Sequence, residues 1–298
     1  MAVAVGAERT SVSGRIFRTP QGRRWQRFLT VVANHCVMIG ICLALLLPFI
    51  FIISMALMPD KEALGNGLIP HHLDWGNFHR VLKLFPFWHY LLNSVLYSGL
   101  SIVGVLISSL PVAYALSRLK WRGREGVMLL VLATLMLPTA VTSVSLYSVY
   151  LNLGWIGSLK PLIVPNFFGD AFSIFLLRQF LRTIPEETTD AARIDGASEF
   201  GIMMRIVVPL TRPALVAVGL FTLVSTWNDF FTPLVYSGSN NKVWTLTVAL
   251  SQFTTLQRGA LYNLQMAGTL LFMAPIIVVF LLAQRTFVEG VTLTGAKG

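Results

Sequence analysis

The sequence predicts an all-α fold, a polytopic membrane bundle of six transmembrane helices. The first reason is composition: the 298 residues are 55% hydrophobic and only 12% charged, whereas soluble domains carry about 25% charged residues. The second reason is that apolar segments long enough to cross a bilayer, which takes about 20 residues, recur along the chain. We therefore expect residues 35–298 to form one transmembrane domain.

The first 34 residues are polar and basic, and they hold six arginines ahead of the first apolar segment. Such a segment favours a disordered cytoplasmic tail close to anionic lipid, which makes membrane lipid a partner. A cleaved signal peptide is the alternative, but the apolar run is too long for one and no small-residue cleavage site follows it. Arg23-Arg24 also lacks the apolar residues that follow in a twin-arginine signal. We expect residues 1–34 to remain as a tail.

Six apolar segments are expected to form the membrane helices. The fourth is the weakest, because Asn166, Gly169 and Asp170 dilute its start. A count of five helices is the alternative, and it would place the C-terminal end on the opposite side of the membrane. The expected spans cover residues 35–57, 91–116, 126–150, 162–182, 206–230 and 262–284.

The distribution of lysine and arginine orients these spans. With six spans, 17 of the 23 basic residues fall in the two termini and in the loops after the second and fourth spans. The side richer in lysine and arginine is the cytoplasmic one, so we expect both termini in the cytoplasm. The net charge of +10 is then a signal of topology. No basic patch interleaved with aromatic residues accompanies it, so nucleic acid is not expected as a partner.

The loop between the fourth and fifth spans is the longest charged interval after the tail. Thr183 and Glu186 have the spacing of a capping box, which predicts a helix start. Gly196 favours the end of that helix, because glycine tolerates the left-handed conformation that follows a helix. Ser198 is placed to cap a second short helix, which is expected to break at Pro209. The loop is thus predicted to fold as helix, bend and helix, although an ordinary amphipathic surface loop would show the same pattern.

Within this loop, Asp190-Ala191-Ala192 is followed after three residues by Gly196, and after nine more by Ile206-Val207-Val208-Pro209. This order resembles the EAA loop of ABC-importer permeases, whose pattern is EAA, three residues, Gly, nine residues and I-x-L-P. The chain departs from it at Asp190 and Val208, and both changes keep the charge or the apolar character. The runs AARIDGAS, VPLTRPAL and WNDF resemble the second permease of carbohydrate importers, the maltose-permease-like group, and the resemblance covers most of the chain after about residue 40.

The resemblance implies a type I permease fold in a bacterial cell membrane, with loop 183–213 coupling the permease to ATP hydrolysis. It implies a homologous second permease, two ABC ATPase subunits and an extracytoplasmic substrate-binding protein as partners. The chain itself is not expected to be an enzyme or to bind a cofactor: it has no G-x-x-x-x-G-K-[ST] motif, so ATP and Mg²⁺ would be bound by the ATPase subunits. The residues expected to couple to the ATPase are Glu186, Glu187, Asp190, Ala191, Ala192, Ile194, Asp195, Gly196, Ala197, Phe200 and Pro209.

Polar residues inside the spans mark a candidate solute path, because polar groups are costly to bury in lipid. Trp227, Asn228 and Asp229 combine an aromatic face with amide and carboxylate groups, which suits a sugar. Their place near the outer end of the fifth span fits a structural cap equally well. The other candidates for this path are Asn93, Asn166, Asp170 and Gln265.

Alternatives remain for the function and for the solute. A secondary transporter would show inverted repeats and ionisable residues at mid-bilayer, and only Asp170 is a candidate. A membrane enzyme would cluster histidine with carboxylates near one interface, and the acidic cluster here lacks histidine. No Cys/His spacing predicts a metal site, and Cys36 and Cys42 are not placed to pair. The solute is expected to be a sugar or oligosaccharide, with glycerol phosphate or a related polyol phosphate as the alternative.

Overall fold

The computed structural model describes residues 20–65, 69–84, 86–256 and 261–295, and the described residues contain helices and turns but no strand. The chain divides into two compact units, residues 1–51 and 52–298. The described part of the first unit is most of helix α1 (Pro20–Ala56). Its apolar side chains from Phe28 onward are largely exposed, as expected of a helix that faces lipid or another membrane protein. Residues 20–34, predicted to be disordered, are helical.

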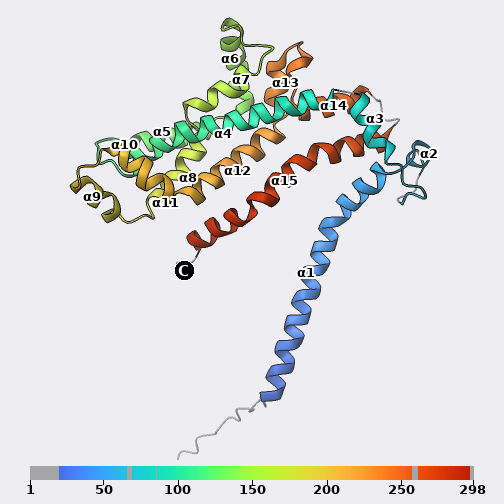
Figure 1. The fold of residues 1–298 in the computed structure, drawn as a ribbon, viewed down its shortest axis with the longest axis horizontal. Helices are drawn as coiled ribbons and strands as arrows, with labels where there is room; N and C mark the ends of the chain where they lie inside the picture. The colour runs from blue at the N-terminus through green and yellow to red at the C-terminus, as the bar shows by residue number, and fades with distance from the viewer. Residues whose placement is uncertain (1–19, 66–68, 85, 257–260, 296–298) are drawn as a thin grey trace, which may run out of the picture. The chain divides into compact units, whose positions relative to one another are not determined.

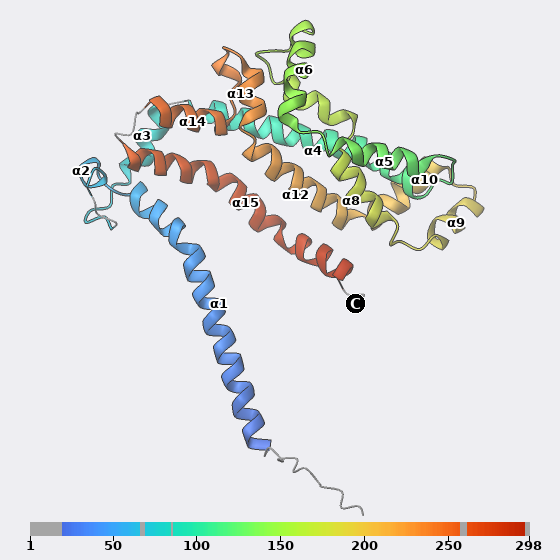
Figure 2. The ribbon, with the colours of Figure 1, turned by 180° about the vertical axis from the view of Figure 1, so that it is seen from behind.

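The second unit is built on four helices that run beside one another (Figures 1 and 2). They are α4 (Phe87–Ser117), α8 (Ala171–Leu181), α12 (Arg212–Asn228) and α15 (Tyr262–Gly295). Helix α4 packs against α8 and α12, and α12 packs against α15. Val105 and Leu110 of α4, Leu177 of α8 and Val218 of α12 share one buried cluster.

Shorter elements complete this unit. At one end of α4 lie α9 and α10, and α3 and α14 lie at the opposite end (Figure 1). The shorter elements are α2 (Asp60–Ala63), α3 (Gly76–Leu84), α5 (Arg124–Thr134), α6 (Thr139–Asn152), α7 (Lys160–Ile163), η1 (Val164–Phe168), α9 (Glu187–Ile194), α10 (Glu199–Ile202), η2 (Met203–Val207), α11 (Val208–Leu210), α13 (Phe231–Ser237), η3 (Asn241–Val243) and α14 (Leu246–Leu256).

Four helical stretches among the described residues are long and apolar enough to cross a membrane. They correspond to the first, second, fourth and sixth predicted spans. A fifth arises if the two helical pieces Glu199–Leu210 and Arg212–Asn228, which meet at 78°, are one broken span. The all-α membrane fold is therefore confirmed, and the count of six is not.

The third predicted span, residues 126–150, is wrong as a continuous helix. It is divided into α5 and α6 by a turn over residues 135–138. Pro138 lacks the N–H that a helix needs and holds the residue before it away from helical angles. Its own backbone is extended, with φ −63° and ψ 129°. The apolar composition of this segment concealed the interruption.

The predicted break at Pro209 is also wrong. Pro209 lies in the first turn of α11, where a missing N–H is tolerated, and the chain bends two residues later at Thr211. The preceding η2 is a short π-helix. Such wide turns are typical of sites where a helix is interrupted. The Thr211 hydroxyl donates to the carbonyl of Val207 at 2.8 Å.

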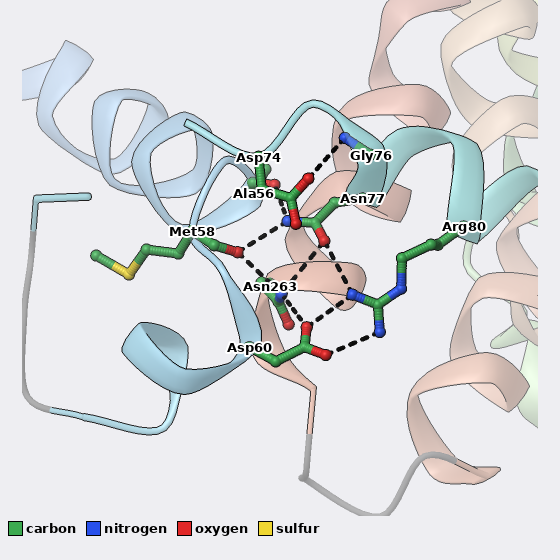
Figure 3. A network of polar contacts seen from close by, with 8 residues as sticks. All are labelled: Ala56, Met58, Asp60, Asp74, Gly76, Asn77, Arg80 and Asn263. Carbon is green, nitrogen blue, oxygen red and sulfur yellow. Dashed lines mark hydrogen bonds and ion pairs between the residues drawn. The ribbon is translucent and has the colours of Figure 1, made fainter. Parts of the chain in front are cut away.

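A buried polar network joins the chain after α1 to α3 and α15 (Figure 3). The Asn77 amide donates to the carbonyls of Ala56 and Met58 at 2.9 and 2.8 Å. The Asn263 amide donates to Met58 at 2.9 Å and to Asp60 at 2.7 Å. Both asparagines are fully buried, so these bonds replace water around backbone carbonyls.

Arg80 closes the network with two bonds to the Asp60 carboxylate, at 2.8 and 2.9 Å. The bonds from Arg80 and then Asn263 lower the pKa of Asp60 below its ordinary 3.8. A carboxylate whose pKa is lower in the folded than in the unfolded state stabilises the folded state at every pH above its unfolded pKa. Its contribution to stability is therefore present at neutral pH and is lost as the pH falls below about 3.8 through the folded pKa.

Asn77→Ala is expected to destabilise the folded chain by about 1–3 kcal/mol. The carbonyls of Ala56 and Met58 would each lose the bond from Asn77, and Met58 would keep the bond from Asn263. The matched control is Asn228→Ala. Asn228 is exposed and donates one bond to Val224 in its own helix, so its loss should cost about 0.5 kcal/mol or less. Thermal unfolding of both variants in detergent measures the difference. Equal melting temperatures would show that the network adds no stability.

Candidate coupling site and solute path

Helix α9 begins later than the sequence predicted. It starts at Glu187, and no side chain of Glu186 caps it. The Thr183 hydroxyl donates to the carbonyl of Phe180 at 2.7 Å. The predicted capping box is therefore wrong, because Thr183 is held by the end of the preceding helix. Glu187 and Asp190 lie in the first turn of α9, where carboxylates interact favourably with the helix dipole.

The bend after α9 has the predicted conformation. Gly196 has φ +79°, and its amide donates to Arg193 at 3.0 Å, while the Ala197 amide donates to Ala192 at 3.0 Å. These two bonds form a Schellman motif, which satisfies carbonyls at a helix end and requires the left-handed residue. Ser198 then caps α10 by accepting from the Gly201 amide at 3.2 Å, also as predicted.

Apolar side chains project into solvent on both sides of this bend. Ile194 is 86% exposed and Phe200 is 70% exposed. Ala191 is exposed, whereas Ala192 is half-buried against the core shared by α4, α8 and α12. The remaining predicted coupling residues are all exposed: Glu186, Glu187, Asp190, Asp195, Ala197 and Pro209. Two large apolar residues beside a small one, ringed by carboxylates, are typical of a surface that binds another protein.

Arg193 ties the two short helices together across the bend. Its guanidinium lies 2.6 Å from the Asp190 carboxylate and 2.7 Å from that of Glu199. The bond to Glu199 and then the bond to Asp190 raise the pKa of Arg193. The Tyr114 hydroxyl of α4 donates to the same Glu199 carboxylate at 2.5 Å. The sequence prediction missed Tyr114, which is 85 residues away from its partner.

Two buried arginines fasten the adjacent ends of α4 and α8. Arg118 donates to the carbonyls of Leu181 and Ile184 at 2.5 and 2.6 Å. Arg178 donates to the carbonyl of Leu116 at 3.1 Å and to Glu125 at 2.6 Å. The last carbonyls of a helix lack partners within it and attract cations. Each helix end is therefore capped by an arginine of the other helix.

A cavity of about 370 Å³ lies among α4, η1, α8 and α12. It brings together two of the predicted solute-path residues, Asn166 and Asp170, and adds hydroxyl groups of α12 that the sequence prediction missed. The residues that line it are Val105, Asn166, Asp170, Phe172, Ser173, Phe221, Thr222, Ser225 and Thr226. Amide, carboxylate and hydroxyl groups beside two aromatic rings are the groups that bind polar organic solutes.

Asn166 and Asp170 are held in place by α4 and by the start of α8. The Asn166 amide donates to Ser101 at 3.0 Å. The Asp170 backbone amide donates to Ser109 at 3.1 Å, and its carboxylate caps α8 by accepting from the Ser173 amide at 2.8 Å. Asp170 therefore has a structural role besides its place in the cavity wall.

The other five predicted path residues do not line this cavity. Asn93 donates to the carbonyls of Lys242 and Trp244, and Trp227 is buried in an apolar cluster. Asn228 bonds within α12. Asp229 accepts from the Tyr97 hydroxyl and the Thr232 amide. It therefore has the structural capping role that the sequence allowed as the alternative to a sugar contact. Gln265 lies half-buried on α15.

Comparison with known proteins identifies the class. Residues 104–292, which include α4 from its middle onward and helices α9 and α10, match the family model described as binding-protein-dependent transport system inner membrane component. The chain belongs to this family. The resemblance to ABC-importer permeases is thereby confirmed, and the alternatives of a secondary transporter and a membrane enzyme are set aside.

Relatives extend the match over nearly the whole permease. The arabinooligosaccharides transport system permease protein AraQ of Halalkalibacterium halodurans is 32% identical over 256 residues, which cover 84% of this chain and 91% of that protein. The trehalose/maltose permease protein MalG of Thermococcus litoralis is 28% identical over 91% of this chain and 97% of its own. The sn-glycerol-3-phosphate transport system permease protein UgpE of Shigella flexneri is 30% identical over 91% of this chain and 97% of its own length.

A solved structure confirms the fold. It is the crystal structure of a bacterial ABC transporter involved in the import of the acidic polysaccharide alginate. One of its chains superposes on this permease with a TM-score of 0.73 and 25% identity, covering 91% of this chain and 99% of that one.

Proposed function

We propose that this permease carries a sugar or oligosaccharide into a bacterial cell, driven by ATP hydrolysis on partner subunits. It works with a homologous second permease, two ABC ATPase subunits and an extracytoplasmic binding protein that delivers the solute. The observation that carries the proposal is the exposed pair Ile194 and Phe200 on either side of a rigid bend, in a chain of this family. Such a surface suits docking to an ATPase in the cytoplasm.

The distribution of charge supports the orientation. Helices α9 and α10 lie at one end of α4 (Figure 2). Arg118 ends α4, Lys120 pairs with Glu186 just before α9, and Arg193 lies in the last turn of α9. Cytoplasmic loops are the ones rich in lysine and arginine. The α9–α10 segment is then on the inner side, both termini are cytoplasmic, and the elements at the far end of α4 face outward.

The cavity favours an uncharged solute over a phosphate. Among the described residues that line it, Asp170 is the one charged side chain, whereas phosphate recognition uses arginine or lysine. The names of AraQ and MalG refer to arabinooligosaccharides and to trehalose and maltose, and that of UgpE to glycerol phosphate. A carbohydrate therefore fits the site better than a polyol phosphate.

The experiment reconstitutes the complete complex with its binding protein and measures stimulation of ATP hydrolysis by a panel of solutes. The panel holds arabino-oligosaccharides, maltose, trehalose and sn-glycerol 3-phosphate. Stimulation by one of the sugars is the expected result. Stimulation by glycerol phosphate alone would establish the alternative solute, and a complex without ATPase subunits would refute the proposed function.

Thr222→Val is expected to weaken transport of the stimulating sugar. Thr222 lines the cavity, and the change removes its hydroxyl with little change in volume. One lost hydrogen bond of about 1 kcal/mol raises the half-saturating sugar concentration about five-fold. Uptake into proteoliposomes measures it. Thr269→Val on α15 is the control, because its hydroxyl bonds to Gln265 in its own helix at 2.9 Å; equal effects of both changes would argue against a solute contact.

A further inference from the structure

The α9–α10 segment is bonded to a helix that it does not join in sequence. The loop connects α8 to α12, yet the Tyr114 hydroxyl of α4 donates to Glu199, which also binds Arg193 of α9. Tyr114 is buried, and the contact stands at the inner end of α4. A displacement of α9 therefore reaches α4 through three side chains: Arg193, Glu199 and Tyr114. We call this chain of bonds the relay.

A second connection begins on the other side of α9. Ile184 lies three residues before that helix, and its carbonyl accepts from Arg118 at the end of α4. Arg118 is 6% exposed, and a buried guanidinium needs such bonds because its charge has lost water. The reciprocal bond from Arg178 to Leu116 joins the ends of α4 and α8 firmly. Both ends of α9 are thus attached to the same helix pair.

The covalent path from α10 to α12 is less rigid. It passes through the π-helix η2 and then through the 78° bend at Thr211. Interrupted helical turns of this kind are common hinge positions. Movement of α9 is transmitted better by a chain of short bonds to α4 than through two successive interruptions.

Helix α4 in turn holds the wall of the cavity. Ser101 accepts from the Asn166 amide, and the Ser108 hydroxyl donates to the Asn166 carbonyl at 3.1 Å. Ser109 accepts from the Asp170 amide. Three serines of α4 therefore fix the two polar residues that η1 and the start of α8 contribute to the cavity.

We propose that α4 receives the movement of α9 and delivers it to the cavity, with Arg193, Glu199, Tyr114 and Arg118 as positioning residues. This inference rests on the proposed function, in which the α9–α10 segment docks on an ATPase. The four residues set how far the cavity responds to the ATPase, and docking itself depends on the exposed surface around Ile194 and Phe200.

A nearby ion pair provides the matched control. Lys120, just after α4, lies 3.2 Å from Glu186, just before α9. Both side chains are mostly exposed, 75% and 62%, and exposed ion pairs contribute little. Lys120→Gln removes a contact between the same two segments while leaving the relay through Glu199 intact.

The test measures the width of the cavity region in the assembled complex. Spin labels are placed at Val103→Cys on α4 and Val224→Cys on α12, both exposed positions, with Cys36→Ser and Cys42→Ser to remove the native thiols. The distance between the labels is compared without nucleotide and after trapping with Mg-ATP and orthovanadate. The relay variants are Tyr114→Phe and Glu199→Gln, and Arg193→Lys keeps a cationic donor.

In the wild type and in Lys120→Gln, trapping is expected to shift the distance. In Tyr114→Phe and Glu199→Gln the shifted population should fall about five-fold or more, the lower range of coupling between linked sites, while bound ATPase stays unchanged. Arg193→Lys should keep part of the shift. A normal shift in both relay variants, or no shift in the wild type, would refute the relay. Loss of ATPase from the variants would assign these residues to docking, and a wild-type complex without ATPase would refute the proposed function as well.

Discussion

Phe200→Ala is expected to remove most of the ATPase from the purified complex. The Phe200 ring is 70% exposed on α10 just after the bend, so a partner can bury nearly all of it. Aromatic side chains buried at the centre of an interface contribute about 2 kcal/mol or more. A loss of about 2 kcal/mol weakens binding about 30-fold. The measurement is the amount of ATPase retained per permease after purification from membranes.

The matched control is Phe168→Ala. Phe168 is 83% exposed and belongs to η1, at the opposite end of α8 from the loop that carries α9 and α10. Its removal takes away the same aromatic side chain without changing the α9–α10 segment. The two variants should reach the membrane in equal amounts. ATPase retention in Phe200→Ala equal to that in Phe168→Ala would exclude Phe200 as an anchor.

Gly196→Val is expected to abolish transport while the permease still inserts. At φ +79° a β-branched residue is strained by roughly 1–3 kcal/mol. A steric clash with neighbouring residues is not the cause of the strain, because no atom lies within 4 Å of an added Cβ. The strain is relieved when the Schellman turn opens, which separates α9 from α10 and displaces Ile194 relative to Phe200. Uptake in proteoliposomes and permease abundance in membranes are the two measurements.

Gly154→Val separates strain from coupling. Gly154 has φ +67° and an equally open surrounding, and it follows α6 rather than α9. It should lower thermal stability by an amount similar to Gly196→Val and leave ATPase binding intact. Normal uptake by Gly196→Val, or equal loss of uptake in both variants, would mean that the bend has no specific part in coupling.

The sequence predicted those helix ends whose conformation is set by neighbouring residues in the chain. Gly196 and Ser198 take the expected conformations because a helix end needs a left-handed residue and a helix start needs a side-chain acceptor. Thr183 had the right spacing for a cap, but its hydroxyl bonds to the end of α8. The apolar run over residues 126–150 has the composition of a span, and Pro138 divides it.

Tertiary contacts decided the rest. The sequence singled out Asn166 and Asp170 because polar groups inside apolar segments are costly, and both line the cavity. Threonine and serine are too common in membrane helices for Thr222 and Ser225 to be singled out in the same way. Trp227 and Asp229 have chemistry that suits a sugar, and the fold uses them for packing and capping. The bond from Tyr114 to Glu199 joins residues 85 positions apart, and no local pattern signals it.

The central claim, that the α9–α10 segment docks on an ATPase, is tested most directly by photo-crosslinking. A benzoylphenylalanine in place of Ile194, which is 86% exposed beside the bend, is irradiated in native membranes, with the same residue in place of Phe168 as the control. The account predicts an adduct of the permease with the ATPase subunit at position 194 and none at position 168. Absence of the ATPase adduct at position 194 in membranes that contain both proteins, or equal adducts at both positions, would contradict it.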